Sequence, residues 1–436
     1  MSSLKNISVQ CFCIVMLLVN YFSVKTYGAD LYWDSDANTS GLGNSNGSWS
    51  SEVWSSDTDG TDAKSWVNGS TAIFSDGSPT ITADLANVTI DGITVTGSNA
   101  NITIANGSGS LELSSGGSGN FNIAAGSNLS INETLDYQST GMLTKTGMGV
   151  LTFGVNNTGS GPNFTTIEQG KIDLNSGVTD LIGGIFGSGS DKSMVGGLGT
   201  IDNTLTIGSD NNEIDFISPG LGSASSFSSA DSLKQSPSGR SSGAVGKFTT
   251  TTLNWNGGGV YDWEIKTFTK DNSANHTKFD VLSVSTINFN DKASDAYTVN
   301  IMSVSNDAGA VGAVTNPDQT WQDHLGTNGF KFLTASTVSG MTETGNNVSD
   351  FFNIRADDFY YTNNNWYGTW DVYRSGNDFY LTYSVAPEPS TYVMISALFL
   401  FIGGNRSSRK SIRSIFSTLK NKFSKQNKKF ITAELS

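Results

Sequence analysis

The chain has 436 residues, a formal net charge of −14 at pH 7, 49 glycines and only 15% charged residues. This composition is typical of a folded, β-rich protein and excludes a disordered chain. The acidic balance excludes nucleic acid as a partner, because phosphate binding needs clustered Lys and Arg.

Residues 1–28 are predicted to be a secretory signal peptide. Lys5 precedes an apolar core at residues 11–19, and cleavage is expected after Gly28. Both cysteines lie in this core, so the mature chain would contain no disulfide and no zinc–thiolate site. Residues 29–404 then carry 38 acidic and 14 basic residues, a balance that suits a soluble surface outside the cell.

The mature chain opens on a tryptophan-rich segment. We expect these rings to cap one end of a repetitive β structure, where an open edge would pair with another chain. The tryptophans concerned are Trp49, Trp54 and Trp66.

An acidic stretch lies among these tryptophans. Asp57, Asp59 and Asp62 surround Gly60 and could hold calcium through carboxylate oxygens. The stretch lacks the distal bidentate Glu of a recognised calcium loop. A plain Asp-Gly turn is therefore the favoured interpretation.

Short apolar pairs recur between residues 80 and 217. Polar Asn, Gly and Ser separate them, and this alternation predicts short β-strands with a turn every eight to ten residues or so. The pattern leaves a solenoid, a sandwich or a barrel open, and the absence of a helical stripe favours an all-β fold. The clearest pairs are Val88/Ile90, Ile93/Val95, Ile102/Ile104, Leu111/Leu113, Phe121/Ile123 and Leu129/Ile131.

Residues 141–174 favour a solenoid among these all-β folds. They contain Leu-Thr-Lys-Thr-Gly-Met-Gly-Val-Leu-Thr-Phe and a strand that ends in Gly-Lys-Ile-Asp-Leu. This segment resembles an autotransporter-associated β-strand repeat, with Phe153 and Ile172 in place of the usual leucines. The resemblance implies a right-handed parallel β-helix, so residues 29–219 are expected to be a β-helical repeat region.

Residues 220–246 are rich in Ser and Gly and are predicted to be a linker. Residues 247–385 show alternation again and are expected to be a second β unit, as a sandwich or as further β-helix. Aromatic residues gather at 351–383, where Trp366 and Trp370 alternate as one strand face would. Core packing is the expected role of these rings, with sugar binding as the alternative.

No catalytic site is expected. His276 and His324 lie far apart without a partner pattern, and Phe248 stands where a phosphate loop needs a hydroxyl. We therefore expect no enzyme activity, no cofactor and no metal.

The sequence near the C-terminus has three parts in order. Pro387, Glu388 and Pro389 precede an apolar segment at 392–404, which is shorter than the roughly 20 residues of a spanning helix. A basic cluster follows, and its position predicts a cytoplasmic C-terminus with the acidic bulk translocated. The length and flanking residues of this segment alone also allow a single-pass tail anchor or a buried core helix. The basic cluster consists of Arg406, Arg409, Lys410 and Arg413.

Residues 386–413 closely resemble the PEP-CTERM sorting signal of Gram-negative envelope proteins. The resemblance implies that an exosortase-type membrane protease recognises Pro387-Glu388-Pro389 and processes the tail. A tail of this kind is also described as an ice-binding-protein C-terminal motif, which says little about activity. Residues 414–436 depart from the pattern, because they extend past the arginines as a basic amphipathic helix or a solvated tail.

These expectations combine into one function. The chain would be exported across the inner membrane of a Gram-negative-type bacterium and held at the cell surface or released, with a membrane-associated C-terminal helix. Its role would be structural or adhesive, in an exopolysaccharide layer or biofilm, with surface glycans as partners.

Two alternative functions remain open. A carbohydrate- or ice-binding module predicts a flat exposed array of Thr or aromatic side chains, for which residues 249–252 are a weak signal. A β-helix polysaccharide lyase or hydrolase predicts two carboxylates on adjacent coils roughly 5 to 10 Å apart.

Overall fold

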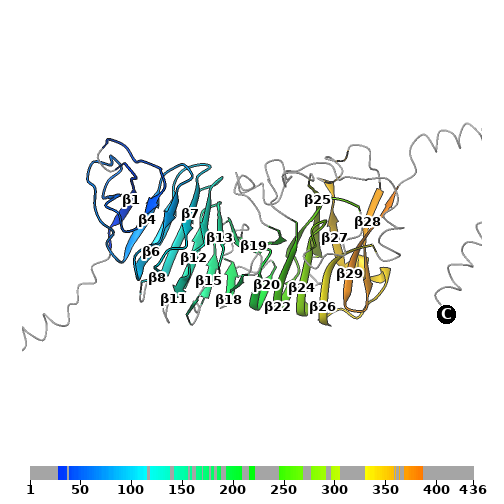
Figure 1. Cartoon of the computed structure of the whole chain (residues 1–436). Coiled ribbons are helices and arrows are strands. Elements are labelled where there is room, and N and C mark those ends of the chain that lie inside the picture. Colours follow the sequence, from blue (N-terminus) through cyan, green and yellow to red (C-terminus); the bar gives the residue numbers. More distant parts are fainter. Residues whose placement is uncertain are drawn as a thin grey trace, which may run out of the picture. The chain divides into compact units, whose positions relative to one another are not determined.

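The computed structural model describes part of the chain. The described residues are 28–36, 39–114, 118–137, 142–155, 158–159, 164–168, 170–175, 178–180, 184–187, 193–208, 216–220, 245–268, 276–290, 296–304, 329–357, 359, 363 and 368–385. They form one 18-stranded and one 11-stranded sheet, which confirms the all-β part of the predicted fold class (Figure 1). Within these residues no helix is long and apolar enough to cross a membrane.

The 11-stranded sheet is parallel wherever its register is defined. Each strand pairs with the next strand of the same sheet, and strands of the other sheet intervene in sequence. In chain order it consists of β2 (Gly47–Ser48), β5 (Thr80–Thr82), β7 (Asn101–Ala105), β10 (Asn128–Ile131), β13 (Val150–Phe153), β16 (Gly170–Leu174), β19 (Ser193–Gly197), β21 (Phe216–Pro219), β23 (Val260–Ile265), β25 (Tyr297–Ser303) and β27 (Phe352–Arg355).

The 18-stranded sheet contains the remaining strands. They are β1 (Asp30–Trp33), β3 (Trp54–Ser55), β4 (Ser70–Phe74), β6 (Val88–Val95), β8 (Leu111–Leu113), β9 (Ser118–Ile123), β11 (Leu135–Tyr137), β12 (Met142–Thr146), β14 (Thr158–Gly159), β15 (Phe164–Ile167), β17 (Thr179–Asp180), β18 (Gly184–Gly187), β20 (Thr200–Ile207), β22 (Lys247–Asn256), β24 (Val281–Asn290), β26 (Phe330–Ser339), β28 (Gly368–Ser375) and β29 (Asp378–Val385). A 3₁₀ helix, η2 (Asn346–Phe351), precedes β27.

In the 18-stranded sheet, some long strands each pair with two shorter strands, one along each half of their length. Strand β6 pairs with β8 through its first half and with β9 through its second half. Strand β20 likewise pairs with β17 near its start and with β18 near its end. Two consecutive short strands therefore occupy the length that one long strand covers.

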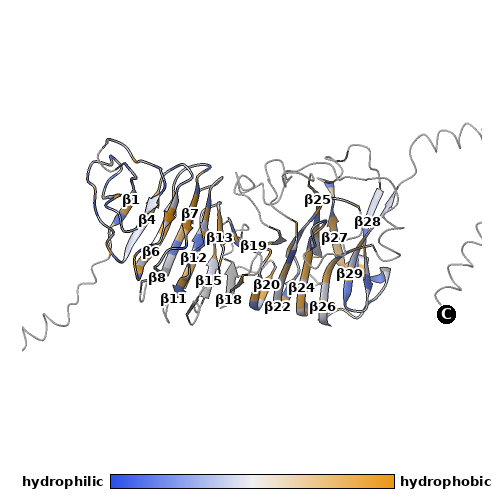
Figure 2. Cartoon of the chain, viewed as in Figure 1, coloured by the Kyte–Doolittle hydropathy of each residue, from blue (hydrophilic) through white to orange (hydrophobic). Residues whose placement is uncertain are grey.

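The core consists of inward-facing residues stacked in register. Ile102 pairs with Leu129, Leu129 with Leu151, and Leu151 with Ile172, and all four are buried. Alternate residues of a strand face opposite sides, so the polar residues between them face outward. The strands accordingly contain both apolar and polar residues, as the hydropathy colouring of Figure 2 shows. The predicted apolar pairs from Val88/Ile90 to Leu129/Ile131 are all buried, which confirms this part of the prediction.

Both sheets continue past the predicted linker. Strand β20 pairs in parallel with β22, and β21 pairs in parallel with β23. The second β unit thus extends the strand pairing of the first. Most of residues 220–246 lie outside the described part, so the linker itself stays a prediction.

The N-terminal end of the sheets is closed by tryptophans, as predicted. Strand β1 pairs antiparallel with β3 and parallel with β4. The Trp54 ring lies 5.1 Å from that of Trp49 and 4.8 Å from that of Trp66, and Trp33 completes the cluster at 5.2 Å from Trp54. These rings cover the end of the core.

The last described strands enclose an aromatic core. Trp370 is buried, and its ring lies 5.9 Å from Trp263 and 5.2 Å from the buried Phe359. Core packing, the expected role of this aromatic stretch, is thus confirmed for Trp370. Strand β29 pairs antiparallel with β26.

Candidate functional site

Four threonines form a column in register on strands β20, β22, β24 and β26. Thr204 pairs with Thr252, Thr252 with Thr286, and Thr286 with Thr337. Adjacent strands lie about 4.8 Å apart, so hydroxyl and methyl groups recur at that interval along the column. Both end members, Thr204 and Thr337, are exposed, and the two central ones are half-buried between their neighbours.

A second column runs beside the first on the same strands. It consists of Thr206, Asn254, Asn288 and Ser339, again in register. The Asn288 side-chain amide donates to Asn254 Oδ1 at 2.8 Å, and the Asn254 amide donates to Thr206 Oγ1 at 3.2 Å. These bonds fix the orientation of the two amides. We call the eight residues of both columns the hydroxyl–amide grid.

The grid faces outward because the residues that alternate with it are core residues. Leu253 and Trp255 on β22, like Ile287 and Phe289 on β24, are buried. Residues two apart on one strand lie about 6.6 Å from each other. The grid is therefore a two-by-four array that repeats at about 4.8 Å in one direction and about 6.6 Å in the other.

The sequence signal at residues 249–252 identified this region only in part. Thr252 belongs to the grid, whereas Thr250 is fully buried and donates from Oγ1 to the Asn203 carbonyl at 3.0 Å. Thr251 is exposed and donates to Asp202 Oδ1 at 2.8 Å. The buried positions of β22 change from Phe248 and Thr250 to Leu253 and Trp255, so simple alternation breaks within the threonine run.

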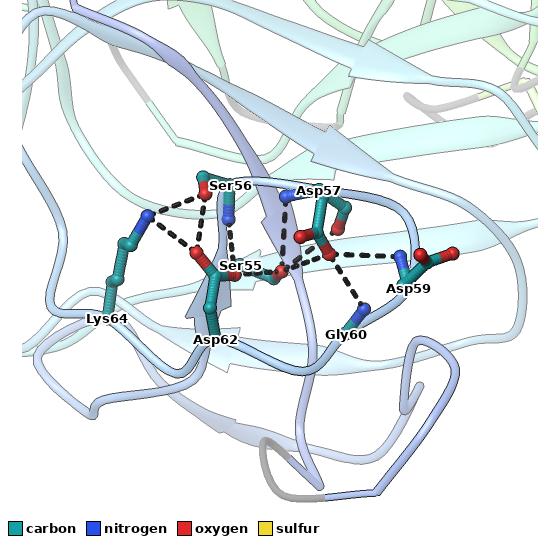
Figure 3. Close-up of polar contacts among 7 residues, drawn as sticks. All are labelled: Ser55, Ser56, Asp57, Asp59, Gly60, Asp62 and Lys64. Carbon is teal, nitrogen blue, oxygen red and sulfur yellow. Dashed lines mark hydrogen bonds and ion pairs between the residues drawn. The ribbon is translucent and has the colours of Figure 1, made fainter.

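The acidic stretch near the N-terminus forms a hydrogen-bonded turn (Figure 3). Asp57 Oδ1 accepts from the backbone N–H groups of Asp59 and Gly60, at 3.0 and 3.1 Å. Gly60 has a φ of 66°, a conformation that glycine adopts without strain. The Asp59 carboxylate points away from Asp57, as Figure 3 shows. This geometry is that of the favoured Asp-Gly turn.

Asp62 is engaged elsewhere in the same loop. Its carboxylate lies 2.6 Å from Lys64 Nζ and accepts from the hydroxyls of Ser55 and Ser56. Lys64, followed by these two hydroxyls, holds the pKa of the Asp62 carboxyl well below its usual range. Within the described residues, no group of three His, Cys, Asp or Glu side chains could hold a metal ion.

Lys145 is a buried cation that the sequence interpretation left without a role. The alternation that turns Leu143 inward also turns Lys145 inward, in register with the buried Phe121 and Ile167. Its Nζ donates to the carbonyl oxygens of Thr146 and Gly147, both at 2.7 Å. Burial lowers the pKa of Lys145 from 10.5 to about 7. The lysine of the repeat-like segment thus stabilises the turn that follows it.

A second set of buried charged side chains lies on and beside strands β16 and β23. Lys171 Nζ lies 2.8 Å from Asp173 Oδ1, and both side chains are almost fully buried. Asp280 accepts from the N–H groups of Gly246 and Glu264, at 2.9 and 3.0 Å. Burial, with the nearby Glu264 carboxylate, raises the pKa of Asp280 well above its ordinary value. The Asp173 and Asp280 carboxylates are therefore buried away from solvent.

The predicted sorting and processing residues fall in a part of the chain that the structure does not describe. Pro387, Glu388 and Pro389 lie outside the described residues, as do the apolar segment 392–404 and residues 414–436. The basic cluster of Arg406, Arg409, Lys410 and Arg413 lies outside them too. His276 is described, with its ring centroid 6.3 Å from that of Phe279, whereas His324 is not.

The described fold and its outward array define the class as an all-β protein with stacked parallel strands. Comparison of the chain with protein-family models, with curated proteins and with solved structures finds no significant match. The proposals below therefore depend on the chain's own residues and geometry.

Proposed function

We propose that the chain is an exported, non-enzymatic protein of the cell surface or extracellular matrix, with a structural or adhesive role. Its parallel strands fit the coils of a right-handed β-helix, with one strand of the 11-stranded sheet in each coil. The observation that carries the proposal is this stack, which continues in parallel register from β5 to β27. Such a stack presents long, regular outer faces.

The closed N-terminal end supports this role. Strand β3 and the tryptophan cluster cover β1, so the first coil does not offer a bare edge to a second chain. A stack closed in this way acts as a discrete rigid element that displays its faces to a matrix. The proposed matrix partners are exopolysaccharide or surface glycans.

Sorting is proposed to depend on the C-terminal sequence. An exosortase-type protease acts at Pro387-Glu388-Pro389, and the apolar segment 392–404 with the following basic residues holds the chain in the membrane until then. The exported part is acidic, and its surface is compatible with a hydrated extracellular layer.

The proposal is tested in the native host with a variant in which Pro387, Glu388 and Pro389 are all replaced by alanine. We expect the variant to stay in the membrane fraction with its tail, whereas the unaltered chain reaches the surface or medium. The Ser390→Ala variant is the control, since it changes a neighbouring residue outside the triplet. Equal distribution of all three chains would contradict the proposed sorting.

A further inference from the structure

We propose that Asp34 and Asp36, directly after strand β1, form a calcium-binding site together with the carbonyl oxygen of Gly41. The site is distinct from the Asp57–Asp62 turn described above. The proposal goes beyond the surface role and does not depend on export or on processing of the tail. It rests on a buried carboxylate oxygen without a donor, on a second carboxylate in contact with the first, and on a backbone oxygen beside them.

The Asp34 carboxylate is buried where strand β1 ends. Only 1% of the residue is exposed, and its backbone N–H donates to the Val53 carbonyl at 2.8 Å. Asp34 Oδ1 accepts from the Gly43 N–H, also at 2.8 Å. Asp34 Oδ2 is buried as well, and it has no hydrogen-bond donor among the described residues. A buried anionic oxygen without a donor is costly, so this atom points to a cation as its partner.

A second carboxylate touches the first. The side chains of Asp34 and Asp36 lie within hydrogen-bond reach of each other, and the Asp36 side chain also contacts Thr39. Two carboxylates in contact repel each other unless a proton or a cation lies between them. Asp36 is exposed, so an ion can reach the pair from solvent.

A backbone oxygen lies beside the pair because two loops meet there. The Gly41 N–H donates to the Asp59 carbonyl at 2.8 Å, which brings the two loops together. Gly60, the next residue, is buried and has a φ of 66°. A Cβ on Gly60 would lie 2.8 Å from Asp34 Oδ2 and would collide with the Gly41 carbonyl oxygen. Both oxygens therefore converge on one side of this glycine, where the absence of a side chain permits close approach.

The donor set selects calcium. Its members are all oxygens, namely two carboxylates and a peptide carbonyl, whereas zinc and copper sites use nitrogen or sulfur ligands. Magnesium requires a near-ideal octahedron, but calcium accepts irregular sets that combine carboxylates, loop carbonyls and water. A set with only two carboxylates fits the weak range of extracellular calcium sites, roughly 10⁻⁴ to 10⁻³ M.

Calcium at this position would join β1 to both loops of the N-terminal end. Asp34 and Asp36 follow β1, Gly41 belongs to the loop before β2, and Gly60 belongs to the loop after β3. An ion that binds only the folded chain stabilises it by mass action. Calcium is therefore expected to strengthen the end of the stack that the tryptophans close.

The test measures terbium luminescence and calcium calorimetry on the purified full chain. Terbium(III) occupies calcium sites, and Trp33, the neighbour of Asp34, should sensitise its emission. We expect calcium at about millimolar concentration to displace the terbium. Asp36→Asn removes an exposed anionic ligand and should weaken calcium binding about tenfold or more. Glu52→Gln is the matched control, because it removes an exposed acid of the same region, and it should leave binding unchanged.

Urea unfolding with calcium or with a chelator supplies a second readout. Calcium should raise the unfolding midpoint of the unaltered chain and of E52Q but not that of D36N. If D36N misfolds, Asp34→Asn decides, because its amide oxygen keeps the bond from the Gly43 N–H while the anionic ligand is lost.

Three results would overturn the proposal. One is the absence of calcium binding at about 10 mM, which would leave a shared proton between the two carboxylates. Another is equal calcium binding by the unaltered chain and D36N, which would place the ion elsewhere. The third is displacement of terbium by magnesium as readily as by calcium.

Discussion

The buried amine of Lys145, on a strand with parallel neighbours on both sides, makes the stability of the chain depend on pH. Its pKa is lowered to about 7 in the folded chain, against 10.5 when exposed. The unfolded chain therefore holds a proton on this residue between these pH values while the folded chain does not. The free energy of unfolding must therefore rise with pH across this window. Below pH 7 both states hold the proton, so the full cost of burying the charged amine remains. Replacing Lys145 by Met removes the titration.

The magnitude follows from proton linkage. Each pH unit in the window contributes up to about 1.4 kcal/mol to the free energy of unfolding. Integration between pH 7 and pH 9, with half-protonation at pH 7, gives about 2 kcal/mol. The K145M variant should lack this increment. It should also be less stable than the unaltered chain at pH 9, because the Thr146 and Gly147 carbonyls lose their donor.

Urea unfolding at pH 6, 7, 8 and 9 measures this effect for both chains. The difference in unfolding free energy between them should grow by about 2 kcal/mol from pH 7 to pH 9. Lys64→Met is the control, because that lysine lies at the surface and its replacement tests for a general effect of losing a lysine. A difference between the unaltered chain and K145M that stays constant with pH would refute the reasoning.

Three further predictions concern stability, measured by urea unfolding at constant pH. Trp54→Ala removes the centre of the N-terminal cluster and should cost about 3–5 kcal/mol, so a midpoint within error of the original would contradict the cap. Gly340→Ala should destabilise more than Gly376→Ala, because both have positive φ but only Gly340 faces a backbone carbonyl where a Cβ would go. Asp280→Asn sets an amide NH₂ against an N–H donor and should cost about 1–3 kcal/mol, and unchanged stability would show that these bonds are not needed.

Much of the first half of the fold was predictable from local patterns. Apolar alternation marks the buried faces of strands such as β7 and β10, because the inward position recurs every second residue. The tryptophan cluster was predictable too, since large rings near a chain end suit a cap. The core role of Trp370 followed from the same alternation.

The hydroxyl–amide grid was not predictable from the sequence. Its columns depend on the register between strands separated by long connections, such as that between Thr204 and Thr252. A shift of one residue would turn Leu253 outward and Thr252 inward. Alternation also breaks between the buried Thr250 and the buried Leu253, so a run of four threonines does not by itself show which of them are exposed.

The burial of Lys145 was not predictable for a different reason. A lysine within a polar-looking motif is ordinarily read as exposed, because a buried cation is costly without partners. Here its partners are backbone carbonyls of the following turn, which no side-chain pattern reveals. Inward alternation with Leu143 was the available signal.

Export and processing both change the length of the chain, so one mass measurement tests them together. The intact mass of the native protein, isolated from its own host and compared between cell fractions, reports both ends of the chain. We predict loss of residues 1–28 and of the residues beyond about Pro389, in surface or medium fractions. A membrane-bound chain that retains its C-terminus through Ser436 would contradict the account and would make the tail a permanent anchor.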